Sequence, residues 1–312
     1  GAAAAISAPR ATAPLGHCLL GFAADPLGEK GVCARATRDV RAGEAVLVEA
    51  PLLRAAKPSP LCVARLGALA QHLRGRSEEE RRVVATLAIQ KFALVRAFAE
   101  APESVREKVL GLQCDFADAG AAVARAVAWL APQLAEAALF AGQGAGAVPD
   151  RDGIFAGGAA LAEREIRAAV TSTIVNGFDW MPDGAEALFY TGCLVEHSCS
   201  PNVKMHIVLP PGAAPADDAW IGEWRASRAL RRGEAVCGSY LEDALLALPR
   251  AERRAALLRR MGFVCACDRC KAEEQAASVR PLSWADAATA TAVGSLSRAC
   301  RADAGRRAAS KK

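Results

Sequence analysis

Three cysteines stand within six residues near the C-terminal end of the chain, in the run CACDRC at 265–270. Three thiolates at this spacing can wrap one tetrahedral metal ion, and zinc commonly takes such a site. Three unrelated buried cysteines would give the same letters, but a cluster this tight is uncommon outside metal sites. We therefore predict about one zinc ion per chain in a structural role. A metal ion bound there would fix the conformation of residues 265–270.

A zinc ion held by three thiolates needs a fourth ligand from elsewhere in the chain. A site with four thiolates carries a charge of about −2, and the neighbouring Arg269 and Lys271 would offset it. The residues alone leave six candidates open: Cys193, Cys199, Cys237, Cys300, His197 and His206.

The length and the cysteine count describe a chain that folds without disulfide bonds. At 312 residues it is long enough for one or two domains with a real core. Its 11 cysteines are an odd number and stand singly apart from the cluster, whereas secreted disulfide scaffolds are shorter, denser and even-numbered. We therefore expect a reducing compartment, cytoplasmic and/or nuclear.

Charge and hydropathy argue against nucleic-acid binding and against a membrane-spanning helix. The formal net charge of +5 is small for a dedicated nucleic-acid arm, so we do not expect direct nucleic-acid binding. The sequence contains no run of about 18 uncharged apolar residues, so we expect no membrane-spanning helix. The nearest stretch, 121–141, is interrupted by Arg125, Pro132 and Glu136.

The two ends of the chain carry β-strand patterns and the middle carries helix patterns. Strands are predicted at 32–34, 45–49, 203–209 and 220–225, the last with Trp220 and Trp224 on one face, and a short one runs through Val236. Helices are predicted from a capping box at 77–80 to about 98, at 103–110, at 116–140 with a break at Pro132, at 161–174 and at 249–260. Residues 142–158 are predicted to be a glycine-rich loop.

One internal repeat stands out. Residues 37–46 (TRDVRAGEAV) resemble residues 227–236 (SRALRRGEAV). Each copy predicts a strand, a glycine turn and a second strand. The copies are too far apart in sequence for a solenoid. We expect two hairpins at opposite ends of one β-rich fold, with helices inserted between them.

Five motifs in chain order carry a family resemblance. Residues 196–202 (EHSCSPN) resemble the Asn-His-Ser-Cys-x-Pro-Asn signature of SET-domain protein-lysine methyltransferases. Residues 233–240 (GEAVCGSY) are similar to the family's Gly-Glu-Glu-(apolar)-x-x-x-Tyr segment. The others are 263–270 (FVCACDRC), like the post-SET zinc segment; 30–34 with 41–44, like the N-terminal SET hairpin; and 176–178 (NGF), like the Asn-x-Phe element.

The resemblance covers about residues 26–271 and is nearest to the SET-and-MYND group, whose SET domain is split by a long insertion. The insertion here holds only Cys62, His72 and Cys114, too few ligands for a MYND zinc finger, so we expect a helical insert instead. The implied divisions are a mobile N-terminal segment at 1–25, SET halves at 26–55 and 171–248, the helical insertion at 56–170, a post-SET helix and zinc segment at 249–275, and a disordered tail at 276–312.

The resemblance implies an α+β fold of small antiparallel sheets with a threaded C-terminal segment, a rare topology. It implies a protein-lysine N-methyltransferase that transfers a methyl group from S-adenosylmethionine to a lysine of a histone or non-histone protein. The neutral amine attacks the sulfonium methyl in line, so alignment and exclusion of water do most of the catalytic work. We expect the chain to act as a monomer on a protein or peptide substrate.

Tyr240 matches the family's catalytic tyrosine, whose hydroxyl lies at the narrow point of the lysine channel. A tyrosine that merely closes a strand on the core is the structural alternative. The chain has only two tyrosines, Tyr190 and Tyr240.

The resemblance also assigns cofactor and metal residues. Lys30 and Gly31 match the loop that follows the methionine end of the cofactor through backbone groups, and glycine permits that close approach. Cys199 matches the distant fourth zinc ligand, which completes the set with Cys265, Cys267 and Cys270. The remaining matches to cofactor-contacting positions are Asn176, Glu196, His197, Tyr240 and Phe263.

Two further functions compete with the methyltransferase. One is a catalytically weakened SET-like scaffold that binds proteins through its groove, and the other is a zinc-dependent interaction module without a cofactor. Glu196 stands where the signature has Asn, and Met261 stands where relatives often carry an aromatic channel residue. Glu29 replaces one glycine of the usual Gly-x-Gly loop. The arginines of the helix at 249–260 form a solvated face or a surface for an acidic partner.

Overall fold

The computed structural model describes residues 11–24, 32–55, 78, 93–112, 128, 163–178, 181–182, 184–217 and 219–279. The chain divides into two compact units, residues 1–267 and residues 268–312. Several predictions fall outside the described residues: the segment 1–10, the loop with Lys30 and Gly31, most of the helices predicted at 77–98 and 116–140, the loop at 142–158, and Cys62, His72 and Cys114.

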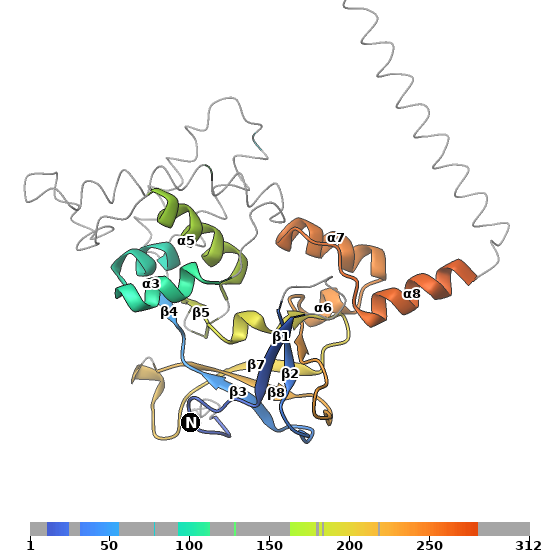
Figure 1. Cartoon of the computed structure of the whole chain (residues 1–312), viewed down its shortest axis with the longest axis horizontal. Coiled ribbons are helices and arrows are strands. Elements are labelled where there is room, and N and C mark those ends of the chain that lie inside the picture. Colours follow the sequence, from blue (N-terminus) through green and yellow to red (C-terminus); the bar gives the residue numbers. More distant parts are fainter. Residues whose placement is uncertain are drawn as a thin grey trace, which may run out of the picture. The chain divides into compact units, whose positions relative to one another are not determined.

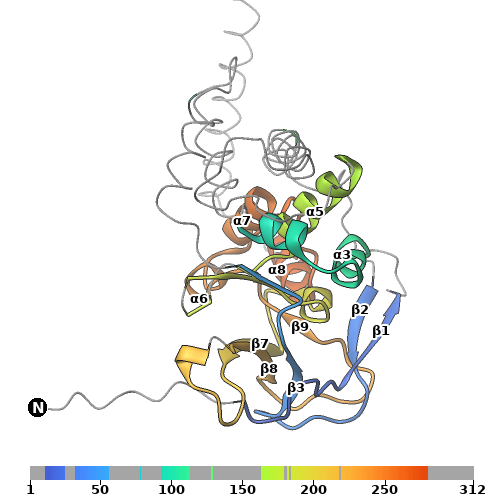
Figure 2. The same cartoon turned by 90° about the vertical axis from the view of Figure 1, so that its left-hand side faces the viewer.

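The described strands of the first unit form four small sheets (Figures 1 and 2). Three sheets are antiparallel and one, of two very short strands, is parallel. They are the hairpin β1 (Leu20–Ala24) with β2 (Val32–Ala36); β3 (Ala45–Glu49), β8 (Ile221–Ala226) and β7 (Val203–Val208) in the order β3-β8-β7; β4 (Leu53–Ala55) with β5 (Glu186–Leu188); and the parallel pair β6 (Glu196–His197) with β9 (Cys237–Gly238).

The strand β8 is the middle strand of its sheet and is buried on both faces. Trp224 points into the main core, as does Trp220 just before the strand, which confirms the prediction that they share one face. Ile221 lies on the opposite face with Val48 and Val208. Successive side chains of a strand point to opposite faces of the sheet, so both tryptophans lie on the face where they bury the most apolar surface.

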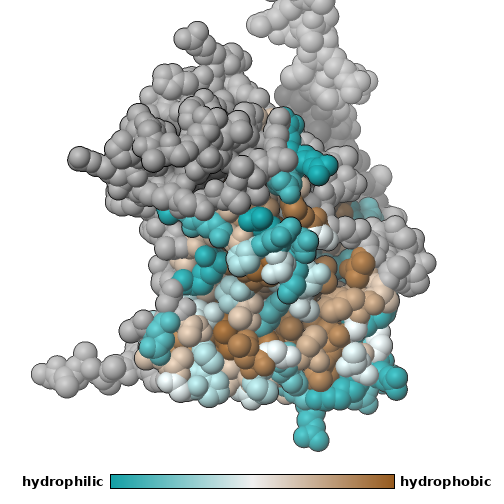
Figure 3. All heavy atoms as spheres, turned by 60° about the vertical axis from the view of Figure 1, so that its left-hand side comes forward, coloured by the Kyte–Doolittle hydropathy of each residue, from teal (hydrophilic) through white to brown (hydrophobic). Residues whose placement is uncertain are grey.

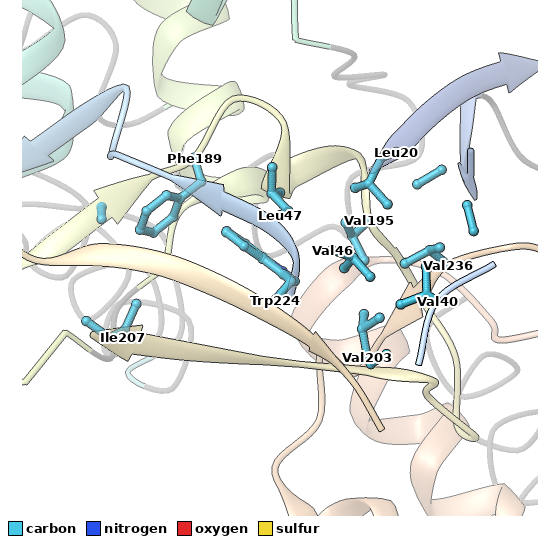
Figure 4. Close-up of a cluster of buried hydrophobic side chains, with 14 of the residues drawn as sticks. Leu20, Val40, Val46, Leu47, Phe189, Val195, Val203, Ile207, Trp224 and Val236 are labelled. Carbon is cyan, nitrogen blue, oxygen red and sulfur yellow. The ribbon is translucent and has the colours of Figure 1, made fainter. Parts of the chain in front are cut away.

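The main core gathers apolar side chains from β1, β2, β3, β5, β7 and β8 (Figure 4). At its centre the ring of Trp224 meets Phe189 edge to face at 5.4 Å and Phe178 at 6.4 Å. A Cβ atom at Gly192 would lie 2.3 Å from Cζ2 of Trp224, and one at Gly222 would lie 2.6 Å from Cζ3. The indole thus occupies space that only glycine leaves open at these two positions.

A second core joins the described helices of the insertion to the β4-β5 pair. It contains apolar residues from the helical residues 93–100, from α3 (Glu103–Leu110) and from α5 (Glu163–Asn176), packed on Leu53 and Leu188. The bounds of α3 confirm the predicted helix at 103–110, which Pro102 precedes as its N-cap. Figure 1 shows α3 and α5 on the side of β4 and β5 away from the three-stranded sheet.

Short helical elements lead to the end of the first unit: 3₁₀ turns at Gly192–Leu194 and Pro215–Asp217, α6 (Asp243–Leu246) and α7 (Arg250–Met261). Pro249 precedes α7 and Gly262 ends it at φ +79°, as expected for a helix with a glycine C-cap. Arg253 of α7 is fully buried and donates from Nη1 to the carbonyl of Leu248 at 2.6 Å. None of the described helices is long and apolar enough to cross a membrane.

The second unit begins with α8 (Asp268–Val279). The helix runs into the range 276–312 that we expected to be disordered, so that expectation is wrong for residues 276–279. An acidic residue in the first turn, Asp268, and an i,i+4 ion pair between Arg269 and Glu273 at 2.8 Å support helix formation, as does the alanine content. Residues 280–312 lie outside the described part of the chain.

The two copies of the internal repeat do not lie at opposite ends of the fold, which corrects the expectation from the sequence. They pair with one another: Val40 and Leu230 form an antiparallel bridge and exchange two backbone hydrogen bonds of 2.9 Å. Figure 1 shows the two turns together at its lower edge. Each copy supplies half of a hydrogen-bonding pattern that neither could complete alone.

Candidate active site and metal centre

The parallel β6-β9 pair brings together two segments that are about forty residues apart in the chain. Glu196 lies opposite Cys237 and His197 opposite Gly238. The buried side chain of Asn202 reinforces this pairing, because its Nδ2 donates to the carbonyl of Ala235 at 2.7 Å and its Oδ1 accepts the N–H of Cys237 at 2.8 Å. The segment 233–240 is therefore fixed against the segment 196–202 by side-chain as well as backbone hydrogen bonds.

His197 lies between Tyr240 and Cys199 and contacts both residues. Its Nδ1 accepts a hydrogen bond of 3.0 Å from the backbone N–H of Tyr240. An imidazole nitrogen that accepts carries no proton, so in the neutral ring the proton is on Nε2. Nε2 lies 3.4 Å from Sγ of Cys199 and is thereby the donor of that contact. The ring is buried, with 5% of the residue exposed.

Tyr240 has its hydroxyl end inside the site. The hydroxyl donates to the backbone carbonyl of Val195 at 3.1 Å. Desolvation raises the pKa of Tyr240 above its usual range, and the negative charges of Cys193 and Glu196, when they are ionised, raise it further. The phenol therefore stays protonated at neutral pH, although 39% of the residue surface is exposed.

Three rings surround this position. The ring of His197 lies 5.4 Å from that of Tyr240 and 6.1 Å from that of Phe263, and Tyr240 and Phe263 meet edge to face at 6.4 Å. Phe263 directly follows Gly262, the left-handed end of α7, so the turn at that glycine places the ring. The structure brings the predicted residues His197, Tyr240 and Phe263 into one cluster.

Asn176, the last residue of α5, carries a buried amide donor. Its Nδ2 has no hydrogen-bond partner within the described part of the chain. Its backbone carbonyl accepts a hydrogen bond of 3.3 Å from the thiol of Cys193, whose pKa burial raises. Since Cys193 also acts electrostatically on Tyr240, it links the end of α5 to the tyrosine. A buried donor without a partner is costly, so a ligand acceptor at this point would be favourable.

Sulfur atoms converge beside His197. Sγ atoms of Cys199, Cys265 and Cys267 lie within 4.8 Å of one another, and all three residues are buried. Backbone N–H groups point at the sulfurs: that of Cys199 donates to Cys267 at 3.3 Å and that of Cys267 to Cys265 at 3.5 Å. Cys270 stands in the first turn of α8, in the second unit, and is also buried.

The electrostatics of the cluster are those of packed thiols. The hydrogen bond with Cys267 and burial raise the pKa of the Cys265 thiol. A bound divalent cation reverses this by stabilising thiolates directly. Arg254 of α7 supports the segment from outside, because its Nε donates to the carbonyl of Cys265 at 2.9 Å. Thiolate sulfurs are ligands that tetrahedral zinc prefers in structural sites.

Three residues of this site have roles that the sequence analysis did not assign to them. Val195 acts through its carbonyl, which any residue would supply, so no side-chain signal could have indicated it. Cys193 was weighed only as a zinc ligand, whereas its thiol bonds to Asn176. The last residue of the 196–202 motif, Asn202, could have been found from its amide, which can donate and accept at once.

Known proteins resemble this chain at the level of solved structures. No protein-family model matches the chain, and no curated protein matches it. A solved structure of the SET domain of LSMT bound to lysine and AdoHcy aligns over 79% of this chain and 53% of that one, at 15% identity and a TM-score of 0.41. A second, bound to methyllysine and AdoHcy, aligns over 80% and 53%, at 15% identity and a TM-score of 0.38. The chain spans about half the length of these two proteins.

Proposed function

We propose that this protein is an S-adenosylmethionine-dependent protein-lysine N-methyltransferase with a SET-type site. The observation that carries the proposal is the pairing of β6 with β9, which sets Tyr240 against His197. These residues come from the two motifs on which the family resemblance rests most strongly, and they are adjacent in the structure. A protein or peptide lysine, of a histone or another protein, would be the substrate.

S-adenosylmethionine would supply an electrophilic methyl group on a sulfonium. Asn176 fits a role in holding it, since its buried Nδ2 has a hydrogen bond to give. Phe263, in the ring cluster with His197 and Tyr240, would provide an apolar wall for the adenine. The backbone of His197, and Glu196, Lys30 and Gly31, are proposed as further cofactor contacts.

Tyr240 would align the reacting groups without giving up its proton. Its raised pKa keeps the hydroxyl a donor, and the carbonyl of Val195 holds the proton in place. The lone pairs of the phenol oxygen remain available to a methyl group or an amine near the site. The target lysine must arrive as the neutral amine, and its lost proton leaves to solvent, so exclusion of water around the rings would favour the step.

Zinc would have a structural role at Cys199, Cys265, Cys267 and Cys270. The four buried thiols and the N–H groups directed at two of them suit a thiolate site. Phe263 stands two residues before Cys265, so a metal at the cysteines would fix the position of that ring. The Nε2–H of His197 would stabilise the thiolate of Cys199 from its other side.

A titration of the full chain with S-adenosylmethionine tests the proposal, followed by methyl transfer to a peptide array. We expect binding in the micromolar range that weakens about tenfold in Asn176→Ala, because one charge-assisted or buried hydrogen bond is worth that much. An exposed substitution on α3, Lys108→Ala, is the control. Absence of binding by the wild-type, zinc-loaded chain would overturn the proposal.

A protein-binding scaffold without catalysis is the second candidate, and Glu196 favours it. Its carboxylate is near enough to Tyr240 to raise the pKa of the phenol, where the family signature has a neutral amide. Binding of S-adenosylmethionine with no methyl transfer to any peptide of the array would favour the scaffold.

A further inference from the structure

The paired turns, residues 35–46 and 225–236, are related by a local two-fold arrangement. Several contacts of one turn have a counterpart 190 residues on. Arg35 Nη1 donates to the carbonyl of Gly233 at 3.1 Å, and Arg225 Nη1 donates to that of Gly43 at 2.9 Å. The N–H of Gly43 donates to Ala226 and that of Gly233 to Ala36, both at 2.7 Å. The glycines have φ +79° and +80°.

The two-fold arrangement includes two internal ion pairs. Arg38 pairs with Glu44 at 2.5 Å and Arg228 with Glu234 at 2.6 Å. Each glutamate also accepts the backbone N–H at the start of its turn, that of Arg41 at 2.9 Å and that of Arg231 at 3.0 Å. The pKa values of both carboxyls are lowered, chiefly by the hydrogen bonds from their arginines. These charges are therefore already matched within each turn.

Three arginines of the paired turns form no ion pair within the described residues. Within the described residues, the guanidinium groups of Arg41, Arg231 and Arg232 donate no hydrogen bond, and all three residues are exposed. The only facing carboxylate left over is that of Asp39, which accepts the N–H of Arg232 at 2.8 Å. With Arg35, whose guanidinium donates to a backbone carbonyl, four cations thus stand against the carboxylate of Asp39 after the ion pairs are set aside.

Arg41 and Arg231 border a shared depression. A groove of about 950 Å³ runs between the turns and is lined by both copies, including Arg41 and Arg231. In Figure 3, which keeps the vertical direction of Figure 1, hydrophilic residues gather at the lower edge where the turns lie. The floor is apolar and rigid, since Val40 and Leu230 beneath it are each 2% exposed.

We propose that the groove between the paired turns is a binding site for phosphate groups, held by Arg41 and Arg231 with Arg232 beside them. Guanidinium forks match phosphate oxygens in bidentate geometry. In an open groove a single charge gains little from one partner, so the ligand must concentrate several negative charges. Adjacent phosphates do so within a few ångströms, whereas acidic side chains on a flexible peptide lose more entropy. The site is independent of the proposed methyl transfer.

Calorimetric titration of the full chain with inorganic tripolyphosphate tests the site, with a short DNA duplex as a second arm that identifies a polymer source of phosphate. We expect Arg41→Gln/Arg231→Gln to weaken binding at least about tenfold. The control with the same charge change, Lys108→Gln/Arg259→Gln on exposed positions of α3 and α7, should bind as the wild type does. Affinity should fall steeply with salt.

A variant expected to bind tripolyphosphate more tightly provides a test that misfolding cannot mimic. Asp39→Asn removes the one opposing charge but keeps an oxygen for the N–H of Arg232, so it should bind tripolyphosphate several-fold more tightly. Equal weakening by both double variants, no tightening in Asp39→Asn, or equally tight binding of a hexaglutamate peptide would each overturn the proposal.

Discussion

The backbone N–H of Tyr240 donates a hydrogen bond of 3.0 Å to Nδ1 of His197. This bond fixes the tautomer of the imidazole, so the other ring nitrogen presents its proton to Cys199. The proposed catalytic tyrosine and the proposed metal centre are therefore two hydrogen bonds apart. A disturbance at the cysteines would be expected to reach the tyrosine backbone through one rigid ring.

Removing the hydroxyl of Tyr240 should separate catalysis from binding. Tyr240→Phe loses the hydrogen bond to Val195 but keeps the ring and its backbone bond to His197. We expect methyl transfer to fall at least about a hundredfold, while affinity for S-adenosylmethionine changes less than about threefold. Tyr190→Phe, at the other tyrosine, is the control. A Tyr240→Phe variant with full activity would show that the hydroxyl is dispensable.

Substituting one predicted metal ligand should release the metal. Cys199→Ser removes the thiolate that is most distant in sequence from the others, and the remaining cysteines hold zinc more weakly. Elemental analysis should find about one zinc per wild-type chain and much less in the variant. Limited proteolysis should then cut faster within 263–279. Cys18→Ser, at an exposed cysteine outside the cluster, should keep its zinc; retention of zinc by Cys199→Ser would assign the ligand elsewhere.

Replacing Glu196 by the amide of the family signature should tighten cofactor binding. The carboxylate cannot donate when ionised, and it adds a negative charge close to Tyr240. Glu196→Asn restores a donor, which we expect to raise affinity for S-adenosylmethionine roughly fivefold or more. Comparison of the two titrations decides the point. Equal or weaker binding by the Asn variant would mean that Glu196 is neutral or is itself a cofactor ligand.

A methyl group at Gly192 should destabilise the main core. The added Cβ would lie 2.3 Å from the indole of Trp224, which is locked between Phe178 and Phe189. Overpacking of this kind costs about 1–3 kcal/mol, so Gly192→Ala should lower the free energy of unfolding by at least that much. Urea unfolding followed by tryptophan fluorescence measures it. Gly21→Ala, whose Cβ would meet its nearest neighbour at 3.4 Å, should show no comparable loss from clash.

The ion pairs of the paired turns should make the free energy of unfolding depend on pH. Glu44 and Glu234 have lowered pKa values in the folded chain, so the unfolded chain binds protons first as the pH falls. Their contribution is complete above the ordinary carboxyl range and is lost as the pH falls through the lowered values. Between pH 6 and pH 3, Glu44→Gln/Glu234→Gln should therefore lose less stability than the wild type. An equally steep acid loss in Glu107→Gln and in the double variant would assign the effect to other groups.

Local sequence signals predicted individual elements well. The strand at 45–49 and the helix at 103–110 match residue for residue, because a glycine turn bounds the first and Pro102 the second. The pairing of the two repeat copies was missed, since similarity between segments does not reveal which strands hydrogen-bond. The helix α8 was also missed, because a stretch without an apolar stripe gives no periodic pattern.

The candidate site was predictable where its chemistry lies in side chains. Motif residues such as His197, Tyr240 and Phe263 were identified, and the structure brings them together. Contacts made by backbone groups, such as the carbonyl of Val195, cannot be predicted from the sequence, because every amino acid supplies the same carbonyl. The unmatched arginines of the paired turns escaped notice for another reason: the net charge of the whole chain averages over surfaces that the fold keeps apart.

The pairing of Arg54 with Ala187 places the strand that leads into the insertion beside a strand that follows the insertion. The insertion thus leaves and rejoins the β-rich body near one strand pair, which forms the root of this branch. Because closing a loop costs only slightly more free energy as the loop grows, the length of the insertion can change with little effect on the body. Evolution could therefore lengthen, shorten or exchange this branch, and with it the surface offered to partners, while leaving the chemistry of the root untouched.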